Sequence, residues 1–245
     1  MTPIRIFFNL ELGFRTKFDR QPKSNSPILF FVLIAYAFFI VGCSKSIEPR
    51  NVSFYGEYFD LELLIMNPER NKIQILELHA KEFNNKDLEK LPSLPELSIL
   101  SIRGTQISEL KSLSITKFPK LATILANETN LDDAGILNWQ NPPVLTKLNF
   151  ANTKIQNPTW LALFPKLRNL NIENTGVASI NEIINCPDLV NLWLADTSVV
   201  SIKPLYSLQN LNYVSIDSLP IPDEELKEFR KELPYAKLVR RGSIF

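Results

Sequence analysis

Residues 145–155 read LTKLNFANTKI, and this phrase decides the fold because it returns along the chain. Six further copies keep its apolar positions in register, with the general form L-x-x-L-x-L-x-x-T-x-I. The copies begin at Ile73, Leu97, Leu121, Leu145, Leu167, Leu189 and Leu211, at intervals of 24, 24, 24, 22, 22 and 22 residues. Self-similarity at a period of this length indicates a repeat architecture whose units bury a common core.

Each phrase predicts one short strand, because its fourth and sixth residues then point to one face while the third, fifth and seventh point to the other. One repeat cannot bury its own apolar face, so neighbouring repeats must stack. The fourth positions form one predicted buried ladder: Leu76, Leu100, Ile124, Leu148, Leu170, Leu192 and Val214. The sixth positions form another: Leu78, Ile102, Ala126, Phe150, Ile172, Leu194 and Ile216.

The phrase resembles the leucine-rich-repeat family, over residues 73–221. The resemblance implies an α/β solenoid of right-handed coils, with a curved parallel sheet on the concave face and short helical, 3₁₀ or irregular segments on the convex face. Five copies carry Thr at the ninth position, where the family more often has Asn or Cys: Thr105, Thr129, Thr153, Thr175 and Thr197. We expect these hydroxyls to bond to the backbone of the turn that leaves each strand.

The amino terminus is typical of an export signal. An apolar run at residues 27–41 follows five basic residues and is shorter than the roughly 20 residues that a membrane-spanning helix needs. Ile40-Val41-Gly42-Cys43 resembles the lipobox of bacterial lipoproteins, which implies removal of residues 1–42 and lipidation of Cys43. The expected location is then the cell envelope, on a membrane surface held by lipid, inner or outer. A signal anchor that is never cleaved is the alternative.

The flanks of the repeats are predicted to cover the two open ends of the solenoid. Residues 43–51 are predicted to be a tether and residues 52–72 an N-terminal cap, in which 52–67 form one or two strands. Residues 222–245 are predicted to be a C-terminal cap with an amphipathic helix at Asp223–Glu232 and a last strand at Ala236–Val239.

Composition argues against chemistry and against nucleic acid. The formal net charge is +1, and removing residues 1–42 leaves 22 basic and 24 acidic residues, so the remainder carries 22 − 24 = −2. Such a chain lacks the basic excess that phosphate backbones attract. With two Cys and one His, and no nucleophile–base motif, we expect no metal, no cofactor and no enzyme activity.

Function is therefore expected on the outward strand positions. Trp193 and Tyr213 should be adjacent, and exposed aromatic residues of this kind are over-represented among binding hot spots. The proposed partner-binding set adds four amides and two charged residues: Asn149, Asn169, Asn171, Asn191, Glu173 and Arg103. The partner would be a protein, or else a glycan. A second interpretation is that the amides only stack on one another and Trp193 only shields its neighbours.

Two other functions stay open. The chain could organise the envelope as a structural lipoprotein, its repeat face contacting another envelope component. The third and least favoured function is that of an enzyme.

Overall fold

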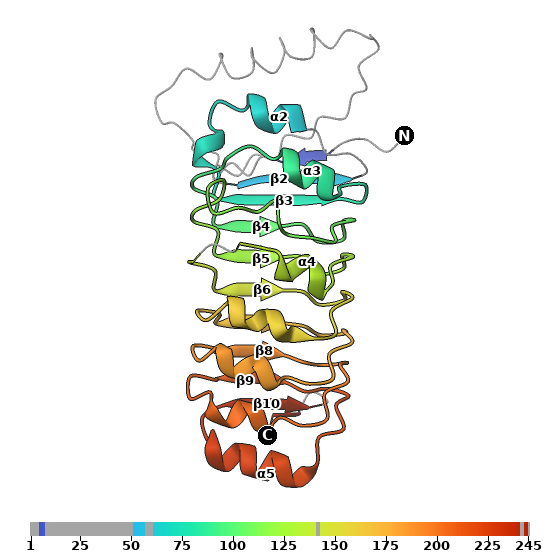
Figure 1. Cartoon of the computed structure of the whole chain (residues 1–245), viewed down its shortest axis with the longest axis vertical. Helices are drawn as coiled ribbons and strands as arrows, with labels where there is room; N and C mark the ends of the chain where they lie inside the picture. Colours follow the sequence, from blue (N-terminus) through green and yellow to red (C-terminus); the bar gives the residue numbers. More distant parts are fainter. Residues whose placement is uncertain (1–4, 8–50, 57–60, 141–142, 241–242, 245) are drawn as a thin grey trace.

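The computed structural model describes residues 5–7, 51–56, 61–140, 143–240 and 243–244. Nine parallel strands follow one another in sequence order in a single sheet (Figure 1). They are β2 (Asn51–Gly56), β3 (Ile75–Ala80), β4 (Ile99–Ser101), β5 (Thr123–Leu125), β6 (Lys147–Asn149), β7 (Asn169–Asn171), β8 (Asn191–Trp193), β9 (Tyr213–Ser215) and β10 (Lys237–Arg240). The antiparallel strands β1 (Arg5–Phe7) and β11 (Ser243–Ile244) lie at the two edges. The predicted parallel-sheet solenoid is confirmed.

The strand register confirms the predicted phase of the repeats. Leu170, for example, lies opposite Leu148 on one side and Leu192 on the other. All seven fourth-position side chains are at most 1% exposed, and all seven sixth-position side chains are 0% exposed. One dry interior therefore runs the length of the solenoid, and the alternate positions face outward.

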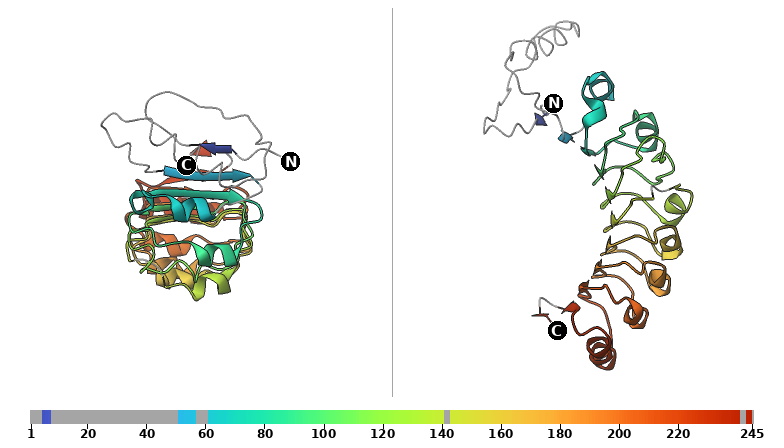
Figure 2. Two further views of the ribbon diagram at one scale, coloured as in Figure 1. Left: turned by 90° about the horizontal axis from the view of Figure 1, so that it is seen from above. Right: turned by 90° about the vertical axis from the view of Figure 1, so that its left-hand side faces the viewer.

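Helical segments cover the outer side of the crescent, while the sheet lines its inner side (Figure 2). They are α3 (Asn85–Lys90), α4 (Asp133–Leu137), η2 (Pro158–Leu163), η3 (Asn181–Asn185), η4 (Lys203–Ser207) and α5 (Asp223–Glu232). Apart from the terminal helix α5, each of these segments has at most six residues, in agreement with the short helical and 3₁₀ segments predicted for the convex face. A period of 22–24 residues leaves no room for longer helices.

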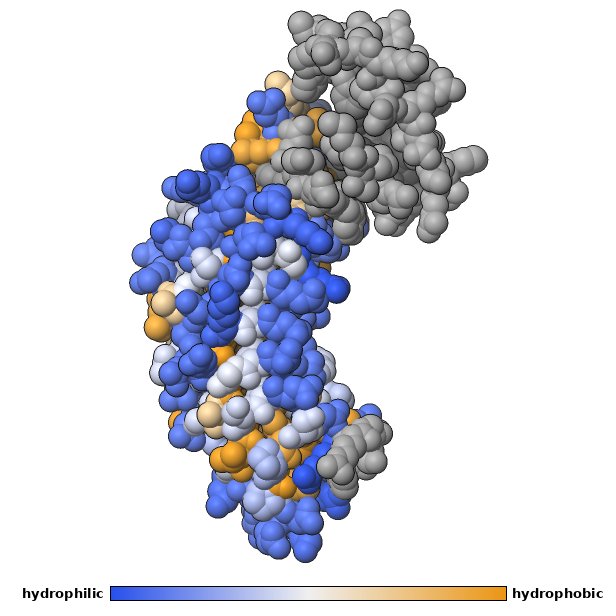
Figure 3. Space-filling view, turned by 90° about the vertical axis from the view of Figure 1, so that its right-hand side faces the viewer, coloured by the Kyte–Doolittle hydropathy of each residue, from blue (hydrophilic) through white to orange (hydrophobic). Residues whose placement is uncertain are grey.

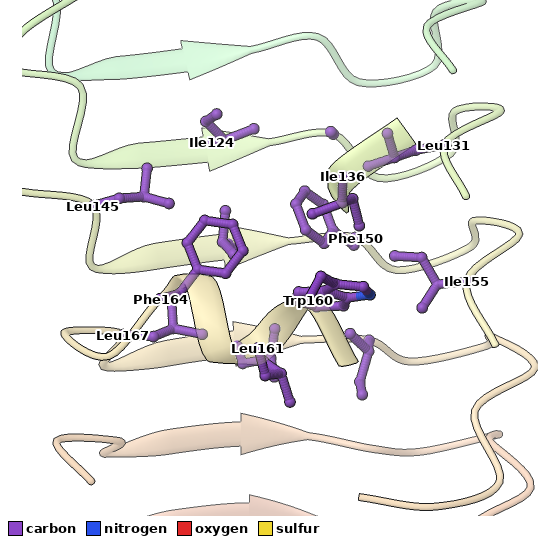
Figure 4. Close-up of a cluster of buried hydrophobic side chains, with 14 of the residues drawn as sticks. Ile124, Leu131, Ile136, Leu145, Phe150, Ile155, Trp160, Leu161, Phe164 and Leu167 are labelled. Atoms are coloured by element: carbon purple, nitrogen blue, oxygen red, sulfur yellow. The ribbon is translucent and has the colours of Figure 1, made fainter. Parts of the chain in front are cut away.

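Aromatic side chains form part of the buried core around β6 and η2 (Figure 4). Trp160, at 0% exposure, packs edge-on against Phe150 and Phe164 at ring-centroid distances of 5.5 and 6.0 Å. Its indole N–H donates to Asp133 Oδ1 at 3.0 Å, and Asp133 Oδ2 accepts the backbone N–H of Gln156 at 2.9 Å. Asp133 thus joins α4 to the following repeat, where a buried indole donor needs an acceptor.

The turn after each strand depends on a left-handed residue and a threonine. The eighth positions of six repeats have positive φ values between 51° and 68°: Gly104, Glu128, Asn152, Asn174, Asp196 and Ser218. Each of the five ninth-position Thr hydroxyls donates to the carbonyl three residues earlier, at 2.6–2.8 Å. The expected bond to the turn is confirmed, and it closes the turn within its own repeat.

The sheet extends beyond the seven repeats that the phrase predicts. Val52 lies opposite Leu76, and Leu238 lies opposite Val214, so β2 and β10 continue the ladder at the same spacing of 24 residues. β2 begins at Asn51, the last residue of the predicted tether. Among the described residues of 52–67, the cap has one strand, β2, and then the helix α2 (Leu61–Met66), which buries Leu64. A 3₁₀ turn, η1 (Arg70–Lys72), follows.

At the other end, α5 spans the residues predicted to be helical, and β10 pairs with the antiparallel strand β11. Within the described ranges, no helix combines the length and apolar composition that crossing a bilayer requires. The predicted apolar signal at 27–41 and the predicted lipid site at Cys43 lie outside the described residues.

Candidate binding surface on the concave sheet

The outward positions of the strands form three rows across the concave face. In β6 to β9 the third positions are Lys147, Asn169, Asn191 and Tyr213, and the fifth positions are Asn149, Asn171, Trp193 and Ser215. The seventh positions, which lie just after these strands, are Ala151, Glu173, Ala195 and Asp217. Seven of the eight predicted binding residues therefore lie on four neighbouring strands, with Glu173 at their carboxyl ends.

Trp193 and Tyr213 form the centre of this surface. Their ring centroids are 5.5 Å apart and the rings are inclined by 44°, which confirms the predicted adjacency. Both side chains are partly exposed. Among the described residues, neither the Trp193 indole N–H nor the Tyr213 hydroxyl has a hydrogen-bond partner, whereas the indoles of Trp139 and Trp160 donate to Leu113 and Asp133. The pair offers solvent an apolar surface with two free donors.

The Glu173 side chain extends from the end of β7 across β8, the strand that carries Trp193, to β9. Its Oε2 accepts from Asn171 Nδ2 at 3.1 Å, and its Oε1 accepts from Ser215 Oγ at 3.4 Å. Asn171 and Ser215 are the two residues that flank Trp193 in register. The carboxylate of Glu173 therefore spans β8 beside Trp193.

The four amides differ in the hydrogen bonds that they make within the fold. Asn191 Nδ2 donates to Asn169 Oδ1 at 2.6 Å, so these two stack across adjacent strands. Asn149 and Asn171 each accept a backbone N–H two residues further on, from Ala151 at 3.1 Å and from Glu173 at 2.9 Å. Each amide has donors or acceptors beyond these bonds, because an amide can make up to four hydrogen bonds.

Arg103 is not part of this group. It follows β4, four strand steps from β8 and thus about 19 Å away at ~4.8 Å per step. Its guanidinium pairs with Glu128 at 3.2 Å, and both side chains are about half exposed, at 59% and 47%. The register places it with the N-terminal half of the sheet, where the outward residues Ile75, Ile99 and Leu125 are apolar.

His79 also lies in the N-terminal half, where it is a partly buried strand residue. Its Nε2 lies 2.8 Å from Ser101 Oγ. Burial lowers its pKa, the nearby Glu77 raises it and Arg103 lowers it. Over the part of the chain that the structure describes, no three His, Cys, Asp or Glu side chains come together as a metal site would require.

The bridging position of Glu173 is the feature that sequence reasoning missed. Glu173 was predicted as one outward residue among several, with no indication that it would reach Ser215 two strands away. The signal available in the sequence was the alternation of Glu173, Ala195 and Asp217 at the seventh position, which leaves only a methyl group between two acids.

The lateral side, where the chain leaves the strands, has a different character. Figure 3 shows that hydrophobic residues gather there over the C-terminal repeats, whereas the N-terminal repeats are mostly hydrophilic. Val200, which follows the turn after β8, is 60% exposed.

Comparison with known proteins defines the fold. No protein-family model and no curated protein sequence matches the chain. An internalin of Listeria monocytogenes superposes with a TM-score of 0.52 at 16% identity, over 75% of this chain and 64% of the internalin. The leucine-rich repeat domain of APL1 gives 0.51 at 18% identity, over 67% and 43%. InlP of Listeria monocytogenes gives 0.50 at 16%, over 60% and 42%.

The chain spans less than two thirds of the length of each of these three proteins. Their structural similarity supports the same fold as the repeat phase and the nine-stranded parallel sheet do. The chain therefore has the leucine-rich-repeat fold.

Proposed function

We propose that this protein binds another protein through the concave sheet, at a surface centred on Trp193 and Tyr213 between β6 and β9. The observation that carries the proposal is the partly exposed ring pair, whose N–H and O–H donors have no partner among the described residues. Aromatic side chains contribute most to binding where polar groups surround them and exclude water. Here the surrounding groups are amides and the Glu173 carboxylate.

The shape of the surface favours an extended segment as the ligand. Three strand steps from β6 to β9 cover about 14 Å, which is the length of roughly four extended residues. No backbone edge is free in the middle of the sheet, because each strand from β3 to β9 pairs on both sides. Recognition therefore depends on side chains, which supply stacking surface and hydrogen bonds.

The test is quantitative capture of partners from the envelope fraction of the producing cell, with the wild-type protein and two tyrosine variants. Tyr213→Ala should lose the partner. Tyr235→Ala is the matched control, because Tyr235 is 92% exposed and lies between α5 and β10, outside the ring pair. Equal recovery by both variants would overturn the concave site. A neutral oligosaccharide that competes for the surface would indicate a glycan ligand.

We also propose that Cys43 carries the lipid anchor and keeps the protein on a membrane of the cell envelope. The support is the basic start, the short apolar run and the residues Ile40 to Cys43. Two or more acyl chains anchor a protein stably where one is marginal. Intact-mass measurement should find an acylated chain that begins at Cys43, while Cys43→Ser stays unacylated. A mature chain that retains residues 1–42 would contradict this.

A further inference from the structure

We propose that the concave surface recognises a cationic side chain, with arginine preferred, which binds between the Trp193 ring and the Glu173 carboxylate. This inference rests on the proposed function and deepens it, since it names the chemistry of the partner segment. The juxtaposition that carries it is a fixed carboxylate lying beside a solvent-facing indole.

The carboxylate is held in place before any ligand arrives. Asn171 and Ser215 both donate to Glu173, at 3.1 and 3.4 Å, from the two positions that flank Trp193. A carboxylate offers about four lone-pair directions, so two bonds leave roughly half of them for a ligand. A group fixed in this way loses little conformational entropy when it binds.

The indole supplies the second contact. Trp is the best of the aromatic side chains for a cation placed over its face, and guanidinium groups also stack on such rings. The Tyr213 ring, inclined by 44° to that of Trp193, limits the approach from the third-position side. A planar cation can therefore lie against the indole and direct its N–H groups at Glu173.

The charge of the surrounding surface agrees with a cationic ligand. The nine outward positions on and just after β7, β8 and β9 hold two acidic residues, Glu173 and Asp217, and no basic residue. Among the outward positions that the structure describes, the nearest basic residues lie one strand further in each direction, at Lys147 and Lys237. The seventh-position side of the surface is thus acidic where the ring pair lies.

Arginine should bind better than lysine for a geometric reason. A guanidinium is planar and presents N–H donors in a fork that fits a carboxylate, while an ammonium is a compact point charge that remains strongly hydrated. Citrulline has the same shape as arginine without the charge. The order expected is therefore arginine, then lysine, then citrulline.

The experiment titrates isotope-labelled full chain with a glycine pentapeptide that has blocked ends and arginine at its centre. The chain has three Trp residues, and those at 139 and 160 donate their indole N–H to internal acceptors. We expect a saturable shift of the Trp193 indole N–H signal alone, with a dissociation constant on the order of 1 mM. The lysine peptide should bind a few-fold more weakly.

Two variants separate charge from shape. Glu173→Gln keeps the size and shape of the side chain, with its amide oxygen able to accept from Asn171 and its NH2 able to donate to the Ser215 hydroxyl, but removes the charge; it should weaken the arginine peptide by about tenfold. Glu182→Gln, in the convex segment η3, is the matched control and should leave binding unchanged. Citrulline binding as tightly as arginine, a neutral oligosaccharide shifting the same signal equally in both variants, or no shift with any peptide would each overturn the proposal.

The captured partner distinguishes this inference from the proposed function. If Tyr213→Ala loses the partner but Glu173→Gln retains it at full affinity, the concave site stands and the cationic contact is wrong. If neither variant loses the partner, the concave site itself is wrong.

Discussion

Replacing Leu170 by Ala tests the phase of the repeats at the middle of the sheet. Leu170 is 0% exposed, and its neighbours in register, Leu148 and Leu192, are 1% and 0% exposed. The substitution removes three carbon atoms, which at about 0.8 kcal/mol each is roughly 2.4 kcal/mol of lost transfer free energy. Strands on both sides hold the backbone, so the cavity cannot collapse fully. We therefore expect the free energy of unfolding to fall by about 3–4 kcal/mol.

Urea unfolding followed by circular dichroism and by tryptophan fluorescence measures this loss. Val200→Ala is the control, because Val200 is 60% exposed and its truncation should change the free energy of unfolding by less than about 0.5 kcal/mol. A loss below about 1 kcal/mol for Leu170→Ala, with an unchanged denaturant slope, would mean that this position is not sealed in a common core. The assignment of inward and outward positions would then be wrong.

Three further predictions concern single turns and the buried thiol. Thr175→Val removes the 2.7 Å bond from a buried hydroxyl to a carbonyl and should lower the free energy of unfolding by about 1–2 kcal/mol, measured in urea. Glu128→Asn should raise it by about 0.5 kcal/mol, because Asn tolerates the left-handed φ of 61° better; a loss would contradict this. Burial raises the pKa of Cys186 to about 12, so alkylation of Cys186 at pH 9 should occur only in unfolded protein. Because the folded thiol holds its proton more tightly, stability should fall from pH 9 towards 12 relative to Cys186→Ala.

The core could be predicted because seven copies remove the ambiguity of any one. Ala126 and Phe150 occupy the same position in adjacent repeats and are both 0% exposed. Neither residue alone indicates a ladder, since Ala is common everywhere and Phe can lie in many settings. The constant spacing fixes both. The same register also implies the separation of Arg103 from Trp193, because their repeats are four steps apart, with three repeats between them.

The end strands were harder to predict because each lies near an end of the stack. The repeat phrase around β2 retains Val52 and Phe54 at its fourth and sixth positions, but its first position is Pro49 in the sequence instead of leucine. β10 retains Leu238, while its sixth position is Arg240, whose guanidinium donates to the carbonyls of Leu219 and Ile221. A strand near the end of the stack packs against fewer neighbouring repeats and needs fewer apolar residues. The repeat phrase is therefore less well kept at the two ends.

The site was predictable only as far as the register reaches. Adjacency of Trp193 and Tyr213 follows from strand order, and the contact is present. The bridge from Glu173 to Ser215 depends on side-chain rotamers, and no residue pattern encodes a rotamer. Sequence therefore gives the neighbourhood of a binding surface before it gives the direction of its polar groups.

The amides on this surface allow a test of whether the outward positions are selected for binding or for the fold. Asn is unfavourable in strands, whereas Thr is favourable and Thr pairs interact across strands. Replacing both Asn169 and Asn191 by Thr removes the 2.6 Å hydrogen bond between their side-chain amides. It also gives both strand positions a residue of higher β-propensity. If the amides serve a ligand, the double variant should be more stable by about 0.5 kcal/mol and should lose partner binding.

If the stacked amides serve only the fold, we expect the reverse: the double variant should be less stable, and its partner binding should be unchanged. Urea unfolding and partner capture on the same protein preparation measure the two quantities. The interior positions of each repeat are set by packing, so a residue that costs stability at an outward position needs another reason to be there. A gain in stability paired with a loss of binding would supply that reason for Asn169 and Asn191.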